Sequence, residues 1–360
     1  MHRGDRLWTG RSTRPHLHQC GGVSAAARGF RPYNSRTNAA ISWVAAVDRH
    51  FTSTGFLVRD GKVLLVNHRK LRMWLPFGGH IEPGEDPVEA LHREAREETG
   101  FEIQIVAERP EIDQRWLHVL PAPETILLED IEPDHVHIDL IYFVRPIGGA
   151  QRLAASEHSE MRWFDRHALG DPAITDDVRL LGARAIDRMA QPRPLSSVQS
   201  ARERGNQMVT ADDKRFTSSG YLVRDGKVLL LNHRRFRLWL PFGGHIEPNE
   251  DPVEALHREA REETGLEIEI VAERPEIDQQ GVHVLPAPET LLLHDIGEGR
   301  ALVDLVYFVR PVNGAVRPLN GEHREVGWFD REALCRPDIR DNVRLLGTQA
   351  IDRMEGPYGS

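Results

Sequence analysis

The sequence predicts an α/β protein built from two tandem copies of one domain, each with a mixed sheet between helices. A shift of 165 residues aligns residues 51–189 with residues 216–354 without a gap. Within each copy, strand-like and helix-like patterns interleave, but their spacing is not that of repeated βαβ crossovers. The length of 360 residues suffices for two domains that each bury a core.

The duplication sets the domain boundaries that we expect. Residues 76–100 differ from residues 241–265 at one position only, Gly84 against Asn249. A repeat this long is a domain in its own right rather than a solenoid unit. The stretch before the first copy is rich in Arg, Ser and Gly, which is typical of a disordered tail, of an upstream stretch foreign to the native protein, or of a transit peptide. The expected segments are a disordered or non-native leader at 1–43, a first domain at 44–190, a linker at 191–212 and a second domain at 213–357.

One copy is enough to describe the expected elements. Residues 55–59 and 62–66 flank the dipeptide Asp60-Gly61, which predicts a β-hairpin. The remaining patterns predict, in chain order, a helix at 87–99, strands at 103–108, 125–128 and 137–144, a short strand ending at 163–164, and an amphipathic helix at 176–189.

Composition and charge exclude several classes of function. The net charge of −9 argues against a nucleic-acid binder with a basic surface, and it means that an anionic substrate needs metal ions or local basic residues. The two cysteines do not occupy matching places, so a reducing, cytoplasmic setting is expected. No apolar run approaches the roughly 18 residues that span a bilayer.

The helix expected at 87–99 carries the acidic residues of interest. Asp86 is a good N-cap, Pro87 suits the first helical position, and Gly100 supplies the stop. Glu94, Glu97 and Glu98 follow helical spacing and would cluster on one stripe. Three carboxylates within one turn repel one another, and Mg²⁺ or Mn²⁺ relieves that repulsion.

A solvated charged helix is the alternative, since such helix faces are common. Two features argue against it. A Gly-Gly turn, Gly78-Gly79, and a further acid, Glu85, precede the helix at fixed spacing, and the whole arrangement recurs in the second copy.

These residues resemble a known family. Gly79, Glu85 and the run from Arg93 to Phe101 match the Nudix box at every defined position. The second copy matches it at Gly244, Glu250 and residues 258–266. The resemblance implies two tandem Nudix-type α/β/α sandwiches, each with a central mixed sheet. It also implies an enzyme, a Nudix hydrolase, that cleaves a phosphoanhydride bond of nucleoside diphosphate-X compounds by attack of water on phosphorus, at two sites.

The resemblance also implies roles for individual residues. Mg²⁺ (or Mn²⁺) would be held by Gly79, Glu94, Glu97, Glu98, Gly244, Glu259, Glu262 and Glu263, where each glycine contributes its carbonyl (or that of Gly78 or Gly243). The residues expected to act in catalysis are Glu94, Glu97, Arg93, Glu259, Glu262 and Arg258. The arginines would orient the acids, while Glu85 and Glu250 would brace the loop.

Other roles stay open at this point. The general base is Glu94 or an acid outside the box, for which the candidates are Glu157, Glu160, Asp139 and their counterparts Glu322, Glu325 and Asp304. Substrate anions could meet Arg69, Lys70 and Arg72, which could equally form a solvated loop. Trp74 and Trp239 could stack on a base, although a place in the core is the better interpretation, and His80 and His245 are interpreted as loop-bracing.

The function of the two copies is also open to more than one hypothesis. The leading hypothesis has two active sites for a small nucleotide-type substrate. The alternatives are one catalytic domain plus one nucleotide-binding or regulatory domain, and a non-catalytic nucleotide sensor. The two domains could pack together.

Overall fold

The computed structural model describes residues 47–191 and 211–356, apart from positions 108, 109, 111, 113, 115, 155 and 317–320. The leader expected at 1–43 and nearly all of the linker expected at 191–212 lie outside the described residues. Both copies belong to one compact unit, Trp43–Ser360. Every helix in the described part of the chain is too short or too polar to cross a membrane.

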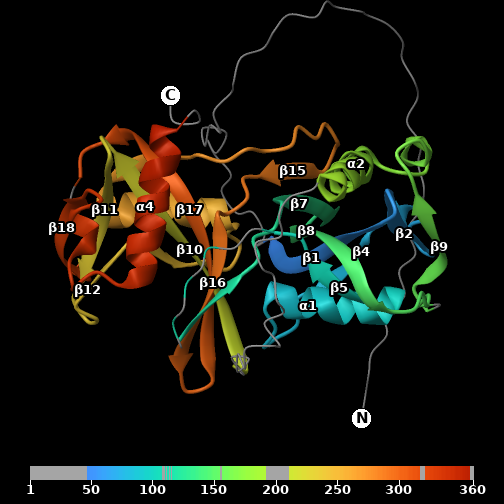
Figure 1. Ribbon diagram of the computed structural model, residues 1–360, viewed down its shortest axis with the longest axis horizontal. Coiled ribbons are helices and arrows are strands. Elements are labelled where there is room, and N and C mark those ends of the chain that lie inside the picture. The colour runs from blue at the N-terminus through green and yellow to red at the C-terminus, as the bar shows by residue number, and fades with distance from the viewer. Residues whose placement is uncertain are drawn as a thin grey trace, which may run out of the picture. The chain divides into compact units, whose positions relative to one another are not determined.

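Each half contains the same elements in the same order (Figure 1). The first half comprises β1 (Asp48–Arg59), β2 (Lys62–His68), β3 (Trp74–Leu75), β4 (Phe77–His80), α1 (Pro87–Glu94), η2 (Ala95–Thr99), β5 (Phe101–Ile105), β6 (Leu117–Leu120), β7 (Thr125–Glu132), β8 (His135–Gly149), β9 (His158–Phe164), η3 (Ala168–Gly170) and α2 (Asp176–Ala190). The second half comprises β10 (Asp213–Arg224), β11 (Lys227–His233), β12 (Leu238–Leu240), β13 (Phe242–His245), α3 (Pro252–Glu259), η5 (Ala260–Thr264), β14 (Leu266–Ile270), β15 (Val282–Leu285), β16 (Thr290–Gly297), β17 (Arg300–Gly314), β18 (His323–Phe329), η6 (Ala333–Cys335) and α4 (Asp341–Glu355).

The central strand of the first half, β1, makes its sheet mixed. It pairs in parallel with β8 and antiparallel with β2 and β4. The β1–β2 turn is the predicted hairpin, and Asp60 and Gly61 both adopt positive φ, 51° and 69°, as a tight hairpin turn of this type requires. The predictions of a mixed sheet and of this hairpin are confirmed.

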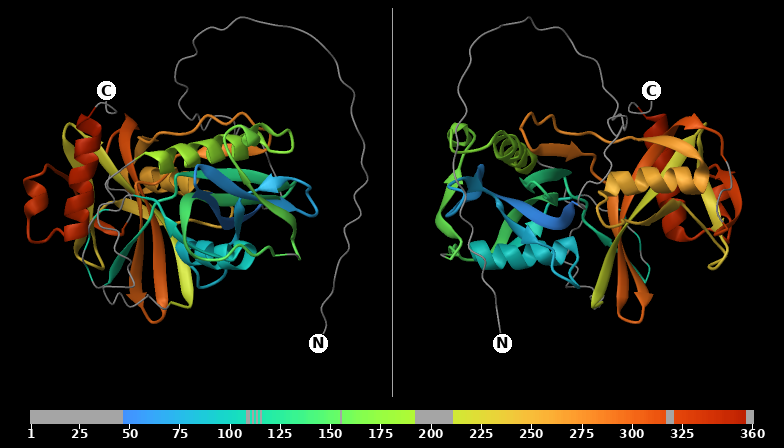
Figure 2. Two further views of the ribbon diagram at one scale, coloured as in Figure 1. Left: turned by 45° about the vertical axis from the view of Figure 1, so that its right-hand side comes forward. Right: turned by 180° about the vertical axis from the view of Figure 1, so that it is seen from behind.

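Helices cover the two faces of each sheet. Alternate residues of β1 point to opposite sides, so Leu57 packs into the cluster that contains Leu91 of α1, whereas Phe56 joins Leu181 of α2. Figure 1 shows α1 and α2 on opposite faces, and Figure 2 shows α3 and α4 placed likewise in the second half. The predicted α/β fold with two mixed sheets is therefore confirmed.

The two halves exchange strands, which self-comparison of the sequence did not reveal. The first sheet runs β15-β7-β8-β1-β2-β3, so its edge strand β15 comes from the second half. Strand β6 of the first half pairs in turn with β16 of the second sheet. Leu117 on β6 is 2% exposed and lies in the core cluster around α4. Each sheet therefore includes a strand of the other copy.

Candidate active site

The acid-bearing helix α1 starts as its sequence predicts. Asp86 Oδ1 accepts from the backbone N–H groups of Val88 and Glu89 at 2.9 and 3.0 Å, and Glu89 Oε2 accepts from Asp86 N–H at 2.9 Å. This reciprocal capping box satisfies N–H groups that an uncapped helix leaves without partners. Pro87 occupies the first turn, where its missing N–H costs nothing.

The helix does not continue as an α-helix to its predicted end. Residues Ala95–Thr99 form a π-helical turn, and Gly100 closes it with φ of 77°. One π turn rotates the side chains that follow it away from α-helical positions, while Glu94 and Glu97 still share Arg93 as a partner. The Glu97 side chain is 61% exposed, whereas that of Glu98 is 8% exposed.

The expected Gly-Gly turn is part of strand β4, where Gly78 and Gly79 pair with β1, and this glycine segment lies directly against the acids. A Cβ at Gly78 would come within 2.7 Å of Ser53 O and 2.8 Å of Thr54 Cα, and a Cβ at Gly79 would overlap the Glu94 carboxylate. Only glycine permits this approach. Burial and, to a lesser degree, neighbouring acids raise the pKa of Glu94 above its usual range, although the contact with Arg93 opposes that shift.

Arg93 ties the loop to the helix. Its Nε and Nη2 donate to the two oxygens of Glu85, both at 2.9 Å, and Nη2 also donates to His80 O at 2.9 Å. Its Nη1 donates to Glu94 Oε1 at 2.5 Å and to Glu97 Oε2 at 3.4 Å. Arg258 makes the same set of contacts in the second half, with Glu250, His245 O, Glu259 and Glu262.

Glu98 is fixed by partners outside the helix. Its Oε1 lies 2.7 Å from His158 Nε2, and its Oε2 accepts from Gly78 N–H at 3.2 Å. Glu157, a candidate general base, offers an oxygen within 4.8 Å of the ligand atoms of Glu98 and His158. The second half repeats the group with Glu263, Glu322 and His323. By the same distance criterion, Glu94, Glu97 and Glu98 do not form one group among the described residues.

Sequence reasoning missed His158 and His323. A signal was available, since the two histidines match under the shift of 165 residues and stand next to the matching acids Glu157 and Glu322. His158 is buried and His323 is partly buried, and each has a buried Nδ1 without a hydrogen-bond partner. Through Nε2 the two histidines contact Glu98 and Glu263, at 2.7 and 2.5 Å.

The remaining candidate residues lie further from the acids of α1 and the π turn or point away from them. Asp139 is buried and accepts from Thr52 Oγ1 at 2.9 Å, and burial raises its pKa to about 6. Glu160 has an oxygen 3.5 Å from Arg162 Nε and points to solvent. Trp74 is 4% exposed and packs against Phe164, so it is a core residue.

The basic loop is exposed. Arg69 is anchored by its Nε, which donates to the backbone carbonyl of His158 at 3.0 Å. Lys70 and Arg72 are exposed, as are Arg234, Arg235 and Arg237 in the second half.

The fold and the duplicated carboxylate site together define an α/β protein with two equivalent acidic centres. The family model described as NUDIX domain matches residues 49–181 and again residues 214–346. The chain therefore belongs to the Nudix family.

Relatives match one half of the chain at a time. A stretch of 145 residues is 30% identical to "8-oxo-dGDP phosphatase NUDT18" of Homo sapiens, which covers 38% of this chain and 39% of that protein. A stretch of 111 residues is 32% identical to "Nucleoside triphosphatase NudI" of Enterobacter sp. (strain 638), covering 31% of this chain and 74% of that protein. Among solved structures, a NUDIX-family hydrolase from Clostridium perfringens is 32% identical, covering 39% of this chain and 98% of its own, with a TM-score of 0.35.

Proposed function

We propose that the chain is a metal-dependent hydrolase that cleaves a pyrophosphate bond of nucleoside diphosphate-X compounds at two sites, one in each half. The observation that carries this proposal is the repeated geometry. In both halves the second glycine of a Gly-Gly pair lies directly against a glutamate carboxylate, and one arginine donates to that carboxylate. The two relatives support nucleotide chemistry, since their names describe a phosphatase of 8-oxo-dGDP and a nucleoside triphosphatase.

The donor atoms fit a hard divalent cation. Glu94 lies against the glycine loop, Glu97 is free to turn toward it from its exposed position, and Glu98 has one lone pair on each oxygen beyond those used by His158 and Gly78. Carboxylate and carbonyl oxygens are the ligands that Mg²⁺ and Mn²⁺ prefer. Glu94, Glu97, Glu98 and the carbonyl of Gly79 would hold the ion, as would Glu259, Glu262, Glu263 and Gly244 in the second half. The bound cation would neutralise charge on the transferring phosphoryl group.

The chain's own residues then have separable tasks. Arg93 keeps Glu94 against the loop and Glu85 keeps Arg93 in place. Glu94 and Glu157 are the two candidates for the base that takes the proton of the attacking water. Glu157 is favoured among the acids outside the box, because Glu160 faces Arg162 and Asp139 is buried under Thr52.

Substrate identity and setting stay predictions. Arg69 contacts the backbone carbonyl of His158 and is the basic residue best placed to meet a substrate phosphate. The cytoplasmic setting rests on the placement of two cysteines in the sequence.

The test is a screen of nucleoside diphosphate derivatives with Mg²⁺ and with Mn²⁺. Glu97→Gln and Glu262→Gln are the informative variants, because both side chains are mostly exposed and their loss leaves the folded core intact. Each single variant should remove the activity of one half, and the double variant should remove all of it. Activity that survives in the double variant would refute the assignment of the acids.

Two further comparisons complete the test. If one single variant abolishes all activity, the other half is a binding or regulatory domain, which is the alternative function. In the Glu262→Gln background, Glu157→Gln tests the base: kcat should fall strongly if Glu157 takes the proton and should stay near the wild-type value if Glu94 does, with Glu160→Gln as the matched control.

A further inference from the structure

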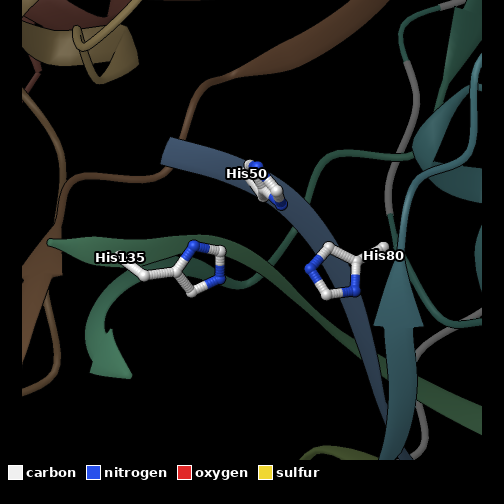
Figure 3. Close-up of side chains that lie close together, drawn as sticks. All are labelled: His50, His80 and His135. Carbon is white, nitrogen blue, oxygen red and sulfur yellow. The ribbon is translucent and has the colours of Figure 1, made fainter. Parts of the chain in front are cut away.

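Four histidines gather at one end of the first sheet, outside the carboxylate site. His50, His80 and His135 each offer a ring nitrogen, and these three atoms lie within 4.8 Å of one another (Figure 3). The ring centroids of His50 and His135 are 4.7 Å apart, and those of His50 and His80 are 5.3 Å apart. His137 completes the cluster, with its ring 4.8 Å from that of His80 and 4.9 Å from that of His135.

Strand register explains why these residues meet. On β1 and β8, which pair in parallel, Asp48 lies opposite His135 and His50 lies opposite His137. On β4, His80 lies opposite Thr52, two residues along β1 from His50. Because side chains alternate across a strand, residues two apart share a face. The sheet itself therefore brings the histidines together, and no loop closure is needed.

Two details point to an ion rather than to ordinary packing. His137 Nε2 is buried and has no hydrogen-bond partner. A carboxylate also stands at the cluster: Asp48 Oδ1 lies 3.0 Å from His50 Nε2 and Asp48 Oδ2 lies 3.8 Å from His135 Nδ1.

We propose that His50, His80 and His135 form a binding site for a transition-metal ion of the Zn²⁺ class, with Asp48 beside them as a further oxygen donor. Imidazole nitrogens suit Zn²⁺, whereas Mg²⁺ prefers oxygen ligands. A tetrahedral ion with bonds of about 2.0–2.1 Å needs nitrogens about 3.3 Å apart, so the rings close by about 1–1.5 Å on binding. The cluster is distinct from the carboxylate site in both ligands and preferred metal.

The second half lacks the site, which makes it an internal control. Counterparts of His50, His135 and His137 are Arg215, Arg300 and Leu302, and only His245 retains the histidine of its counterpart. Arg215 donates instead to Asp213, and Arg300 donates to Glu298. Two guanidinium groups repel a cation and offer it no lone pair. The site is thus a property of the first half alone.

Binding there would act on the neighbouring carboxylate site through His80. Its carbonyl accepts from Arg93 Nη2, and it follows Gly79 in β4. A metal ion that joins His80 to β1 and β8 fixes this end of the glycine loop.

The test measures metal binding directly, on the untagged full chain after removal of metal by a chelator. With Mg²⁺ in excess at the carboxylate sites, we expect calorimetric titration to show a tightly bound Zn²⁺ that depends on His50 and His135, and we expect Co²⁺ to give the absorption of a tetrahedral complex. The double variant His50→Arg/His135→Arg, which copies the second half, should bind Zn²⁺ at least about tenfold more weakly and lose that absorption. His245→Gln in the second half is the matched control and should change neither.

His135→Gln repeats the comparison without new charge, in case the arginine variant does not fold. Unchanged Zn²⁺ affinity and Co²⁺ absorption in either folded variant would overturn the proposal. It would also be overturned if the variants altered the affinity for pyrophosphate while zinc binding stayed the same, because the cluster would then serve phosphate groups.

Discussion

At the scale of single residues, Gly79 is the position where the loop and the acid helix depend most on each other. A side chain there would occupy the space of the Glu94 carboxylate, and Arg93 holds that carboxylate from the other side. Glu94 therefore has little freedom to move away.

We predict that Gly79→Ala lowers kcat of the first half by about 100-fold, because a displacement of about 1 Å at a reacting centre costs roughly that much. The measurement is steady-state kinetics in the Glu262→Gln background, which silences the second half. Gly84→Asn is the control. The second half carries Asn249 there with φ of 71°, close to the 86° of Gly84, so that variant should keep full activity. Equal kcat in both variants would contradict the prediction.

A second residue-scale prediction concerns Glu129. Burial, and then the charges of Asp139 and Asp177, raise its pKa to about 8 from an ordinary 4.5. Between these values the folded state holds a proton that the unfolded state has lost, so the free energy of unfolding falls as pH rises, by up to about 1.4 kcal/mol per pH unit. Glu129→Gln removes this loss, and we expect the variant to be more stable than the wild type at pH 8.

Urea unfolding at several pH values between 4.5 and 8 measures the effect. Glu132→Gln, on the same strand but exposed, serves as the control and should leave the slope as it is in the wild type. A Glu129→Gln variant with the wild-type slope would show that Glu129 is not the group responsible.

At this scale, the sequence predicts which residues form the site better than it predicts how each of them is buried. The box positions, the cap at Asp86 and the stop at Gly100 are readable because each depends on neighbours within a few residues. The burial of Glu98 cannot be predicted from the sequence in this way, because it depends on a π turn and on His158, which lies 60 residues away.

At the scale of elements, the exchanged strand β6 links the stability of one half to a residue of the other. Leu117 is 2% exposed and packs in the cluster that holds Val343 and Leu346 of α4. We predict that Leu117→Ala destabilises the second half by about 2–5 kcal/mol, although it lies in the first. Amide hydrogen exchange should become faster in α4 than in α2.

The corresponding variant on the other exchanged strand should have the opposite effect on amide exchange. Val282, the counterpart of Leu117, lies on β15 in the cluster around α2, so Val282→Ala should speed exchange in α2 rather than in α4. If both variants affected only their own half, the strand exchange would not describe the protein in solution.

Local patterns predict the longer elements and miss the short ones. Asp60-Gly61 indicates the β1–β2 hairpin, and apolar periodicity indicates the helix α2. Strands β3, β4 and β6 have only two to four residues, too few to show a period. The partner of β6 lies more than 160 residues further along the chain, which no local pattern can encode.

At the scale of the whole molecule, the contacts between the halves obey an approximate twofold relation. Arg49 pairs with Asp251 and Glu254 at the start of α3, and its counterpart Lys214 pairs with Asp86 and Glu89 at the start of α1. Phe51 stacks on its own counterpart, Phe216, with ring centroids 4.0 Å apart. Each capping box of an acid helix is thus contacted by a cation from the other half.

This relation predicts the behaviour of a single half. Residues 211–356 expressed alone would expose the unpaired edge of β16 and the apolar face that Leu117 covers, and such edges associate. A second copy can supply every missing group, with Val282 in place of Leu117 and Lys214 in place of Arg49. We therefore expect this fragment to form a homodimer, measured by light scattering after size-exclusion chromatography, whereas Val282→Asp should prevent the dimer by placing a charge in its core. A stable monomeric fragment with slowly exchanging amides in α4 would show that the second half does not need the strand it receives.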